Sequence, residues 1–314
     1  MDLKQVLNTA SVLLVDNTYA GLKDTTFSKY LLTEMIDSPL DATAAFICDG
    51  RIRGVAFKHD FWTLVTDIVM FDPEFESYAA ALLQKNKCNK KQSYTVEAAD
   101  FHQAIVTLLC DLLVSGEACE CYDGRRSHIL AYSPERKERL QLLFKTKIEL
   151  LFDLGATEML EICCGNGMAT AALSDLGYNV YALDNDKCAI CEGLFHGALR
   201  KENTAVLDAR YLSEYEFAQY HKFRSVVGFM LGAIYEFNKT DWQKILSEAA
   251  AIVNEGLFLL TVHKKEEIDF IDKTMNGFGI KGQIIDNRDD TSIYDQWVYI
   301  GVKESTAPGG SVKS

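Results

Sequence analysis

The sequence predicts an α/β fold with a parallel sheet in its second half, preceded by a mainly helical N-terminal domain. A short apolar run, Met159 to Cys163, is typical of a strand buried on both faces. A glycine turn, Cys164 to Gly167, and an alanine-rich helix, Met168 to Leu176, follow it. A second strand, Asn179 to Leu183, then ends in Asp184. Strands that alternate with helices in this way indicate βαβ units.

The glycine turn and the acidic strand end have the order and spacing of a nucleotide-type cofactor site. Glycine is expected at Gly165 and Gly167 because a side chain would block a ligand lying against the backbone. Asp184 falls 17 positions after Gly167, where a carboxylate can accept both hydroxyl hydrogens of a ribose, with Asn185 next to it. The same geometry serves NAD and S-adenosylmethionine. Thr170 stands where the dinucleotide pattern requires glycine or alanine, which disfavours NAD.

The segment Glu161-Ile-Cys-Cys-Gly-Asn-Gly167 resembles the first motif of class I S-adenosylmethionine-dependent methyltransferases. That motif is an acidic residue, an apolar residue and then Gly-x-Gly-x-Gly. Cys163 replaces its first glycine, which is a departure from the family pattern. The resemblance implies S-adenosylmethionine as the cofactor, lined by Glu161, Cys163, Gly165, Gly167, Asp184 and Asn185.

The resemblance extends over about residues 130 to 304. It implies a doubly wound, seven-stranded, mostly parallel sheet with a reversed terminal strand, a feature that separates these enzymes from NAD-binding folds. A third strand would end at Asp208 and Ala209, which the resemblance places near the adenine. An amphipathic helix is expected over Trp242 to Val253. The remaining strands are expected at Phe223 to Phe229, Leu257 to Val262, Ile280 to Asp286 and Trp297 to Lys303.

A chain of 314 residues is long enough for two domains. We expect a helical substrate or lid domain over residues 1–130, a cofactor-binding methyltransferase domain over 131–304, and a disordered tail over 305–314. Tyr132 precedes the helix that begins at Ser133; it is either a cofactor-pocket residue or an interdomain packing aromatic. Turns at Asp49-Gly50 and Asp123-Gly124 suit small hairpins. Helices are expected at Leu3 to Val15, Thr26 to Ile36, Phe75 to Leu83 and Ala98 to Val114.

The net charge and the cysteines indicate which partners, cellular location and metal sites to expect. The net charge of −13 disfavours nucleic acid as a partner, and the basic run Lys85 to Lys91 is interpreted as a solvated loop in preference to a nucleic-acid site. No membrane span or signal peptide is found, and the nine scattered cysteines fit a reducing compartment, so a cytoplasmic protein is expected. Cys188-Ala-Ile-Cys191 has no second CxxC or His pair, so buried thiols are preferred to a metal site.

Three residues are candidates for the acceptor side of the reaction. Tyr235 and Glu236 follow the fourth strand and His263 ends the fifth, so all three would lie at the carboxyl edge of the sheet. His263 is either a general base or a hydrogen-bonded strand-end histidine, and Glu236 is either functional or a solvated loop carboxylate.

The sequence therefore predicts a methyltransferase that acts on a small molecule, with a protein side chain as the second class of acceptor. One alternative is a non-catalytic S-adenosylmethionine-binding or scaffold protein. Another is an NAD-dependent oxidoreductase. The oligomeric state is left open.

Overall fold

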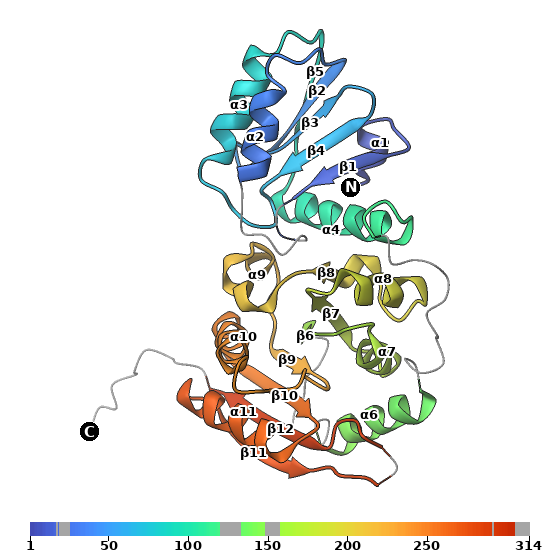
Figure 1. Cartoon of the computed structure of the whole chain (residues 1–314), viewed down its shortest axis with the longest axis vertical. Helices are drawn as coiled ribbons and strands as arrows, with labels where there is room; N and C mark the ends of the chain where they lie inside the picture. Colours follow the sequence, from blue (N-terminus) through green and yellow to red (C-terminus); the bar gives the residue numbers. More distant parts are fainter. Residues whose placement is uncertain (17, 19–25, 120–132, 148–157, 291, 305–314) are drawn as a thin grey trace, which may run out of the picture. The chain divides into compact units, whose positions relative to one another are not determined.

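The computed structural model describes residues 1–16, 18, 26–119, 133–147, 158–290 and 292–304. The chain divides into two compact units (Figure 1). Unit 1 comprises Met1–Cys121 together with Glu214–Tyr220, and unit 2 comprises Tyr122–Ser213 and His221–Ser314. None of the described helices is both long and apolar enough to cross a membrane.

Unit 1 is built on a five-stranded sheet in the order β1-β4-β3-β2-β5, counted over its described residues. Only β3 runs against the other four strands. Its elements are α1 (Leu3–Val6), β1 (Val12–Val15), α2 (Thr26–Glu34), β2 (Ala42–Cys48), β3 (Arg51–Lys58), β4 (Trp62–Thr66), α3 (Phe75–Lys85), β5 (Lys90–Thr95), α4 (Ala98–Val114) and α9 (Phe217–Tyr220).

Helices cover both faces of this sheet. On one face, Val55 and Phe57 of β3 share a core with Leu32 of α2 and Leu82 of α3. On the other, the ring of Phe101 from α4 stacks on Phe46 with 4.9 Å between ring centroids. The sheet is therefore the centre of unit 1, as Figure 1 shows.

The prediction of a mainly helical N-terminal domain is wrong. Strands β2 and β4 are buried along almost their whole length, so they carry no alternation of apolar and polar residues. The predicted helix Leu3 to Val15 is also wrong in its second half: Asn8 has a φ of 49°, past the end of α1, and β1 follows. The helix predicted at Ala98 to Val114 is confirmed as α4.

Two short segments of unit 1 bear on later arguments. The hairpin predicted at Asp49-Gly50 is confirmed between β2 and β3, with φ of 50° and 78° at the two residues. The basic run Lys85 to Lys91 is a loop only in part, since Lys85 ends α3 and Lys90 and Lys91 begin β5.

Residues 214–220 join unit 1 although they lie far along the chain. The N–H of Glu216 donates to the carbonyl of Val69, and Tyr215 forms an isolated β-bridge with Met70. Arg53 of β3 then holds the Glu216 carboxylate at 2.8 Å and 3.1 Å. The sequence contained no sign of this excursion.

Unit 2 contains a seven-stranded sheet in the order β11-β12-β10-β9-β6-β7-β8, within its described residues. All pairs are parallel except those that β12 makes with β10 and β11, so β12 alone is reversed. Its elements are α6 (Pro134–Lys147), β6 (Glu158–Ile162), α7 (Met168–Asp175), β7 (Asn179–Asp184), α8 (Lys187–Phe195), η1 (Lys201–Asn203), β8 (Thr204–Val206), η2 (Ala209–Glu214, whose last residue is in unit 1), β9 (Ser225–Gly228), α10 (Lys239–Ile252), β10 (Gly256–Val262), α11 (Lys265–Gly277), β11 (Lys281–Asp286) and β12 (Trp297–Lys303).

The predicted doubly wound sheet with one reversed strand is confirmed. Helices α6 and α7 share a core with the sheet, through Phe144, Leu173 and Leu259 among others. Helix α8 packs on β7 and β8, and α11 packs on β10, β11 and β12. The chain runs from β6 outward to β8 and returns with β9 on the other side of β6, so the order of strands switches at β6. Open α/β sheets bind their ligands outside the carboxyl ends of the strands at such a point.

Candidate functional site

The turn after β6 is left-handed at three positions. Cys163, Gly165 and Gly167 have φ of 54°, 55° and 81°. The N–H of Gly167 donates to the carbonyl of Cys164 at 3.0 Å, which closes the turn before α7 begins. Cys163 is the non-glycine member of the three, and a left-handed non-glycine residue is uncommon enough to suggest a functional constraint.

The two glycines are required for different reasons. A Cβ at Gly167 would lie 2.5 Å from the side chain of Leu199, so glycine there permits packing within the protein. A Cβ at Gly165 would meet no atom within 4 Å. The open space beside Gly165 is where a ligand could lie against the backbone.

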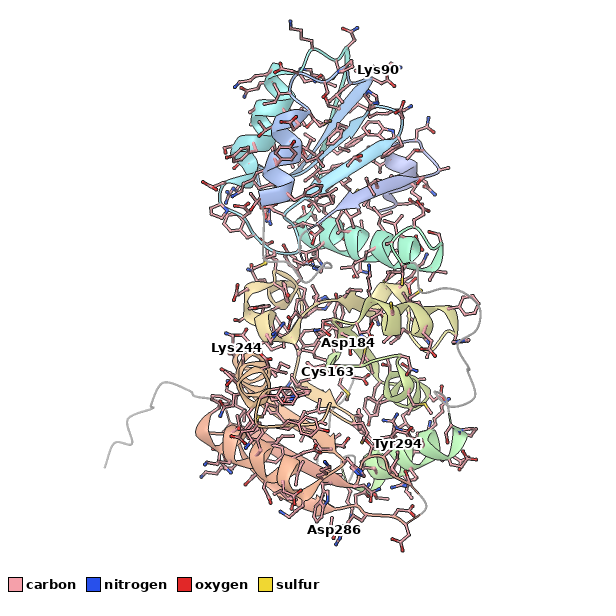
Figure 2. The ribbon with its side chains drawn as sticks, viewed as in Figure 1. Lys90, Cys163, Asp184, Lys244, Asp286 and Tyr294 are labelled. Atoms are coloured by element: carbon pink, nitrogen blue, oxygen red, sulfur yellow. The ribbon has the colours of Figure 1, made fainter. Side chains whose placement is uncertain are left out.

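Asp184 ends β7 beside this turn, and Figure 2 shows it close to Cys163. One carboxylate oxygen accepts from the N–H of Gly165 and the other from the N–H of Asp186, both at 2.8 Å. Burial raises the pKa of Asp184 from its ordinary value, against the lowering effect of these backbone hydrogen bonds. The carboxylate is thus fixed in orientation by backbone donors, and a carboxylate has acceptor capacity beyond these bonds for a further donor.

Glu161 lies beneath the turn and is 1% exposed. Its carboxyl accepts a hydrogen bond of 2.6 Å from the hydroxyl of Thr170 in α7. Burial raises the pKa of Glu161 to about 8, although Thr170 and the positive charge of Arg136 both lower it. The residue that breaks the dinucleotide pattern is therefore the hydrogen-bond donor to the acidic residue of the motif.

Asp208 and its neighbours follow β8. The guanidinium of Arg210 donates to both oxygens of the buried Asp208 carboxylate, at 2.6 to 3.0 Å, and also reaches Asp241 at 3.2 Å. Ala209 is buried and Asn185, after β7, is exposed. A ligand that used Asp208 would have to share it with Arg210, a partner that the sequence did not reveal.

The cysteines of the turn are not prepared as nucleophiles. Burial raises the pKa of both Cys163 and Cys164, and the neighbouring carboxylates raise it further. On α8, Cys191 is buried, as expected, whereas Cys188 is half-buried. No group of three or more potential metal ligands occurs within the described part of the chain. Cys119 is disulfide-bonded, which differs from the expectation of reduced thiols.

The three candidate acceptor-side residues differ in how firmly they are held. The side chain of Glu236 is 88% exposed and pairs with Lys239. Tyr235 is half exposed and stacks on the ring of Phe237. His263 is exposed, but its Nδ1 lies 2.8 Å from the carbonyl oxygen of Ile293, so Nδ1 carries the hydrogen and Nε2 the lone pair when the ring is neutral. Tyr132 lies outside the described residues.

A cluster that the sequence analysis missed lies where β9 and β10 end. The Thr261 hydroxyl donates to Asp295 at 2.5 Å and accepts from the N–H of Met230 at 2.7 Å. Arg136 of α6 reaches the same Asp295 carboxylate at 3.4 Å and lies over the ring of Tyr294, beside α6 in Figure 2. Met230 and Asp295 are left-handed, with φ of 52° and 54°. None of these residues belongs to a spaced motif.

Several solved structures resemble this chain. Magnesium protoporphyrin IX methyltransferase from Synechocystis PCC 6803, with bound S-adenosylmethionine, is 16% identical over 63% of this chain and 97% of its own, with a TM-score of 0.41. The glycopeptide N-methyltransferase MtfA is 15% identical over 55% and 95%, with a TM-score of 0.40. An rRNA methylase from Streptococcus thermophilus is 14% identical over 55% and 95%, with a TM-score of 0.37.

No protein-family model matches the sequence. No curated protein matches it at a significant level. The strand order and the reversed β12 are themselves those of the fold that the sequence resemblance implied.

Proposed function

We propose that the protein is an S-adenosylmethionine-dependent methyltransferase. The observation that carries this proposal is the pairing of Asp184 with the N–H of Gly165 at the point where the strand order switches. A fixed carboxylate suits the two hydroxyls of a ribose, and the open backbone at Gly165 suits the rest of an extended ligand. The reversed β12 favours this cofactor over NAD.

We assign residues to each part of such a cofactor. Asp184 and Asn185 would hold the ribose of the cofactor. Gly165, Gly167 and Cys163 would lie beside the part of the cofactor that leads to its amino-acid end. Glu161 lies beneath this turn, and the positive charge of Arg136 is close enough to lower its pKa, so both are candidates for the amino-acid end of the cofactor. Asp208 and Ala209 would face the adenine. Tyr132 keeps its proposed place in the pocket.

The cofactor supplies a methyl group made reactive by its positive sulfur. The protein then needs mainly to align the acceptor and exclude water. An acceptor that must lose a proton also needs a base, and Nε2 of His263 carries a lone pair for that purpose when the Ile293 carbonyl holds Nδ1–H. Tyr235 and Glu236 remain candidates for contacts with the acceptor.

A small molecule is the favoured acceptor, and a protein side chain is the second. The chain has 45 acidic and 32 basic residues, which disfavours the many phosphate contacts that bind nucleic acid. A small substrate that is neutral or positively charged is not repelled by the negative charge of the protein. Unit 1 is proposed to shape or cover the acceptor site, and a cytoplasmic location is proposed from the composition.

A second function is favoured by one observation. Met230, Thr261, Asp295 and Arg136 are joined by backbone and side-chain hydrogen bonds where the acceptor is expected, so the same fold could bind the cofactor without transferring its methyl group. A non-catalytic S-adenosylmethionine-binding protein would retain Asp184 and the glycine turn.

Calorimetric titration with S-adenosylmethionine, S-adenosylhomocysteine and NAD tests the proposal. We expect micromolar binding of the first two, weakened at least tenfold, or about 1.4 kcal/mol, by Asp184→Ala. Asp175→Ala, at the end of α7, is the control and should bind as the wild type does. Binding of NAD alone would replace the proposal with an oxidoreductase. Transfer of labelled methyl to a small-molecule pool then separates an enzyme from a non-catalytic binder.

A further inference from the structure

Unit 1 contains a cavity of about 880 Å³ at the edge of its sheet where β2, β4 and β5 begin and β3 ends. A volume of this size is within the range of small-molecule sites. The cavity is formed by residues 7–8, 38–42, 58, 62 and 86–92, all of which belong to unit 1. Every described lining residue thus belongs to unit 1.

The walls of the cavity are held by one buried asparagine. Asn86 is 3% exposed, and its Nδ2 lies 2.9 to 3.0 Å from the carbonyl oxygens of Met35, Ile36 and Ser38. Its Oδ1 accepts from the N–H of Cys88 at 2.9 Å. Asn86 thus ties the loop after α2 to the loop before β5, and a site whose walls are fixed in advance loses less entropy when a ligand binds.

The lining of this cavity has the opposite charge to its surroundings. Among the described residues that line it, four are lysines, at 58, 87, 90 and 91, and one is a carboxylate, Asp41. Residues 1–130 as a whole carry 12 basic and 18 acidic side chains, so a third of the basic ones meet here. Concentrating like charges at one place costs free energy through repulsion, and a bound anion would remove that cost.

Three of the four lysines are available to a ligand. The ammonium of Lys91 is already occupied, since it donates to the carbonyls of Leu83 and Asn86 at 2.7 and 2.8 Å. Lys58, Lys87 and Lys90 form no ion pair with any described residue. Figure 2 labels Lys90 at the start of β5. Trp62, Leu7 and Leu40 supply apolar lining beside these charges.

We propose that this cavity binds a small, multiply charged organic anion, with phosphate esters as the favoured class. Lys58, Lys87 and Lys90 would contact its charged groups, and the apolar lining would contact its carbon skeleton. The proposal does not depend on the cofactor, because every residue in it belongs to unit 1. It also gives a role to the basic run that the sequence analysis interpreted as a solvated loop.

Titration of the full chain with pyrophosphate and with citrate tests the site. We expect pyrophosphate to bind saturably. Lys58→Gln/Lys90→Gln should weaken binding at least tenfold. Lys85→Gln/Lys281→Gln, which removes the same charge from exposed positions outside the cavity, should leave binding within twofold. Tighter binding of citrate would assign the site to polycarboxylates.

A second measurement does not depend on substitution. Cys88 lines the cavity and is half-buried, so a bound anion should slow its alkylation several-fold, while half-buried Cys188 of unit 2 should react at an unchanged rate. The proposal is overturned if neither anion binds, if the two double variants lose affinity equally, or if Cys88 reacts at the same rate at saturation.

Discussion

The carboxylate of Asp184 accepts a hydrogen bond of 2.8 Å from the backbone N–H of Gly165, so the end of β7 holds the turn that follows β6. The same carboxylate accepts from the N–H of Asp186. A residue proposed to bind the cofactor is therefore also part of the structure of the cofactor site.

This double role predicts that Asp184→Asn destabilises the protein before any ligand is added. An amide has one oxygen to offer, so one of the two backbone N–H groups loses its acceptor, at a cost of about 1–3 kcal/mol. Urea unfolding of the cofactor-free protein measures this cost. Asp186→Asn is the matched control, because asparagine caps a helix as well as aspartate does, and it should change stability by less than about 0.5 kcal/mol. Equal effects would show that Asp184 has no special structural role.

Replacing each of the two glycines of the turn by alanine should have a different effect on stability and on cofactor binding. Gly167→Ala should lower stability by about 2 kcal/mol or more, because it combines a left-handed φ with a clash against Leu199. Gly165→Ala carries only the cost of the left-handed φ, about 1 kcal/mol, yet it should weaken S-adenosylmethionine binding more than Gly167→Ala does.

Thermal unfolding and calorimetry, applied to both variants, separate the two effects. Adding Leu199→Ala to Gly167→Ala should recover part of its lost stability, since the clashing side chain is then shorter. If the double variant is less stable than Gly167→Ala by the full cost of a core truncation, the clash is not the reason for glycine at 167.

The parts of this site that could be predicted from sequence are those whose residues lie close together in the sequence. The turn, Asp184 and α7 lie within 26 consecutive residues, so strand, glycine and helix patterns were sufficient to predict them. Met230, Thr261 and Asp295 lie far apart in sequence: the parallel pairing of β9 with β10 brings Met230 to Thr261, and the reversed β12 beside β10 brings Asp295 there. No spacing rule relates them.

The errors in unit 1 have a similar cause. Strand β2, Ala42–Cys48, is alanine-rich and buried on both faces, so neither its composition nor its periodicity distinguishes a strand from a buried helix. Asn86 illustrates the same limit at the level of one side chain. Its four hydrogen-bonded neighbours become visible only when α2 and α3 are packed on the sheet.

The raised pKa of Glu161 predicts how stability changes with pH. Its ordinary value is 4.5 and its value in the folded protein is about 8. Below pH 4.5 both states hold the proton. As the pH rises toward 8, only the unfolded state releases it, so the free energy of unfolding falls by about 1.4 kcal/mol per pH unit, or about 4 kcal/mol between pH 5 and 8.

Glu161→Gln removes this contribution because glutamine does not ionise. Urea unfolding at pH 5, 6, 7 and 8 measures the free energy of unfolding of both proteins. The value for the variant minus the value for the wild type should increase as the pH rises, whichever protein is the more stable at pH 5. Glu266→Gln, an exposed position on α11, should parallel the wild type throughout. A constant difference between Glu161→Gln and the wild type would mean that Glu161 is ionised in the folded protein at neutral pH.

The last prediction concerns residues 214–220, which belong to unit 1 although the residues on either side of them belong to unit 2. Arg53 is buried and donates to Asp67 at 2.7 Å and to Glu216 at 2.8 and 3.1 Å, while the hydroxyl of Tyr220 donates to Glu216 at 2.7 Å. Burial lowers the pKa of Arg53, but the carboxylates of Glu216 and Asp67 raise it by more. The net shift is upward, so the guanidinium stays charged. Arg53→Met would leave two buried carboxylates without a positively charged partner, which costs about 3–5 kcal/mol.

Hydrogen exchange of α9 and β3 measures this loss where it occurs. Arg51→Met is the matched control: it lies on the same strand, its side chain is 47% exposed, and its pair with Glu76 should contribute less than about 1 kcal/mol. The triple variant Arg53→Met/Asp67→Leu/Glu216→Met removes all three charges and should recover much of the protection lost in Arg53→Met. If the triple variant is as poorly protected as the single one, the hydrogen-bond geometry of Arg53, and not the charge left uncompensated, holds residues 214–220 in unit 1.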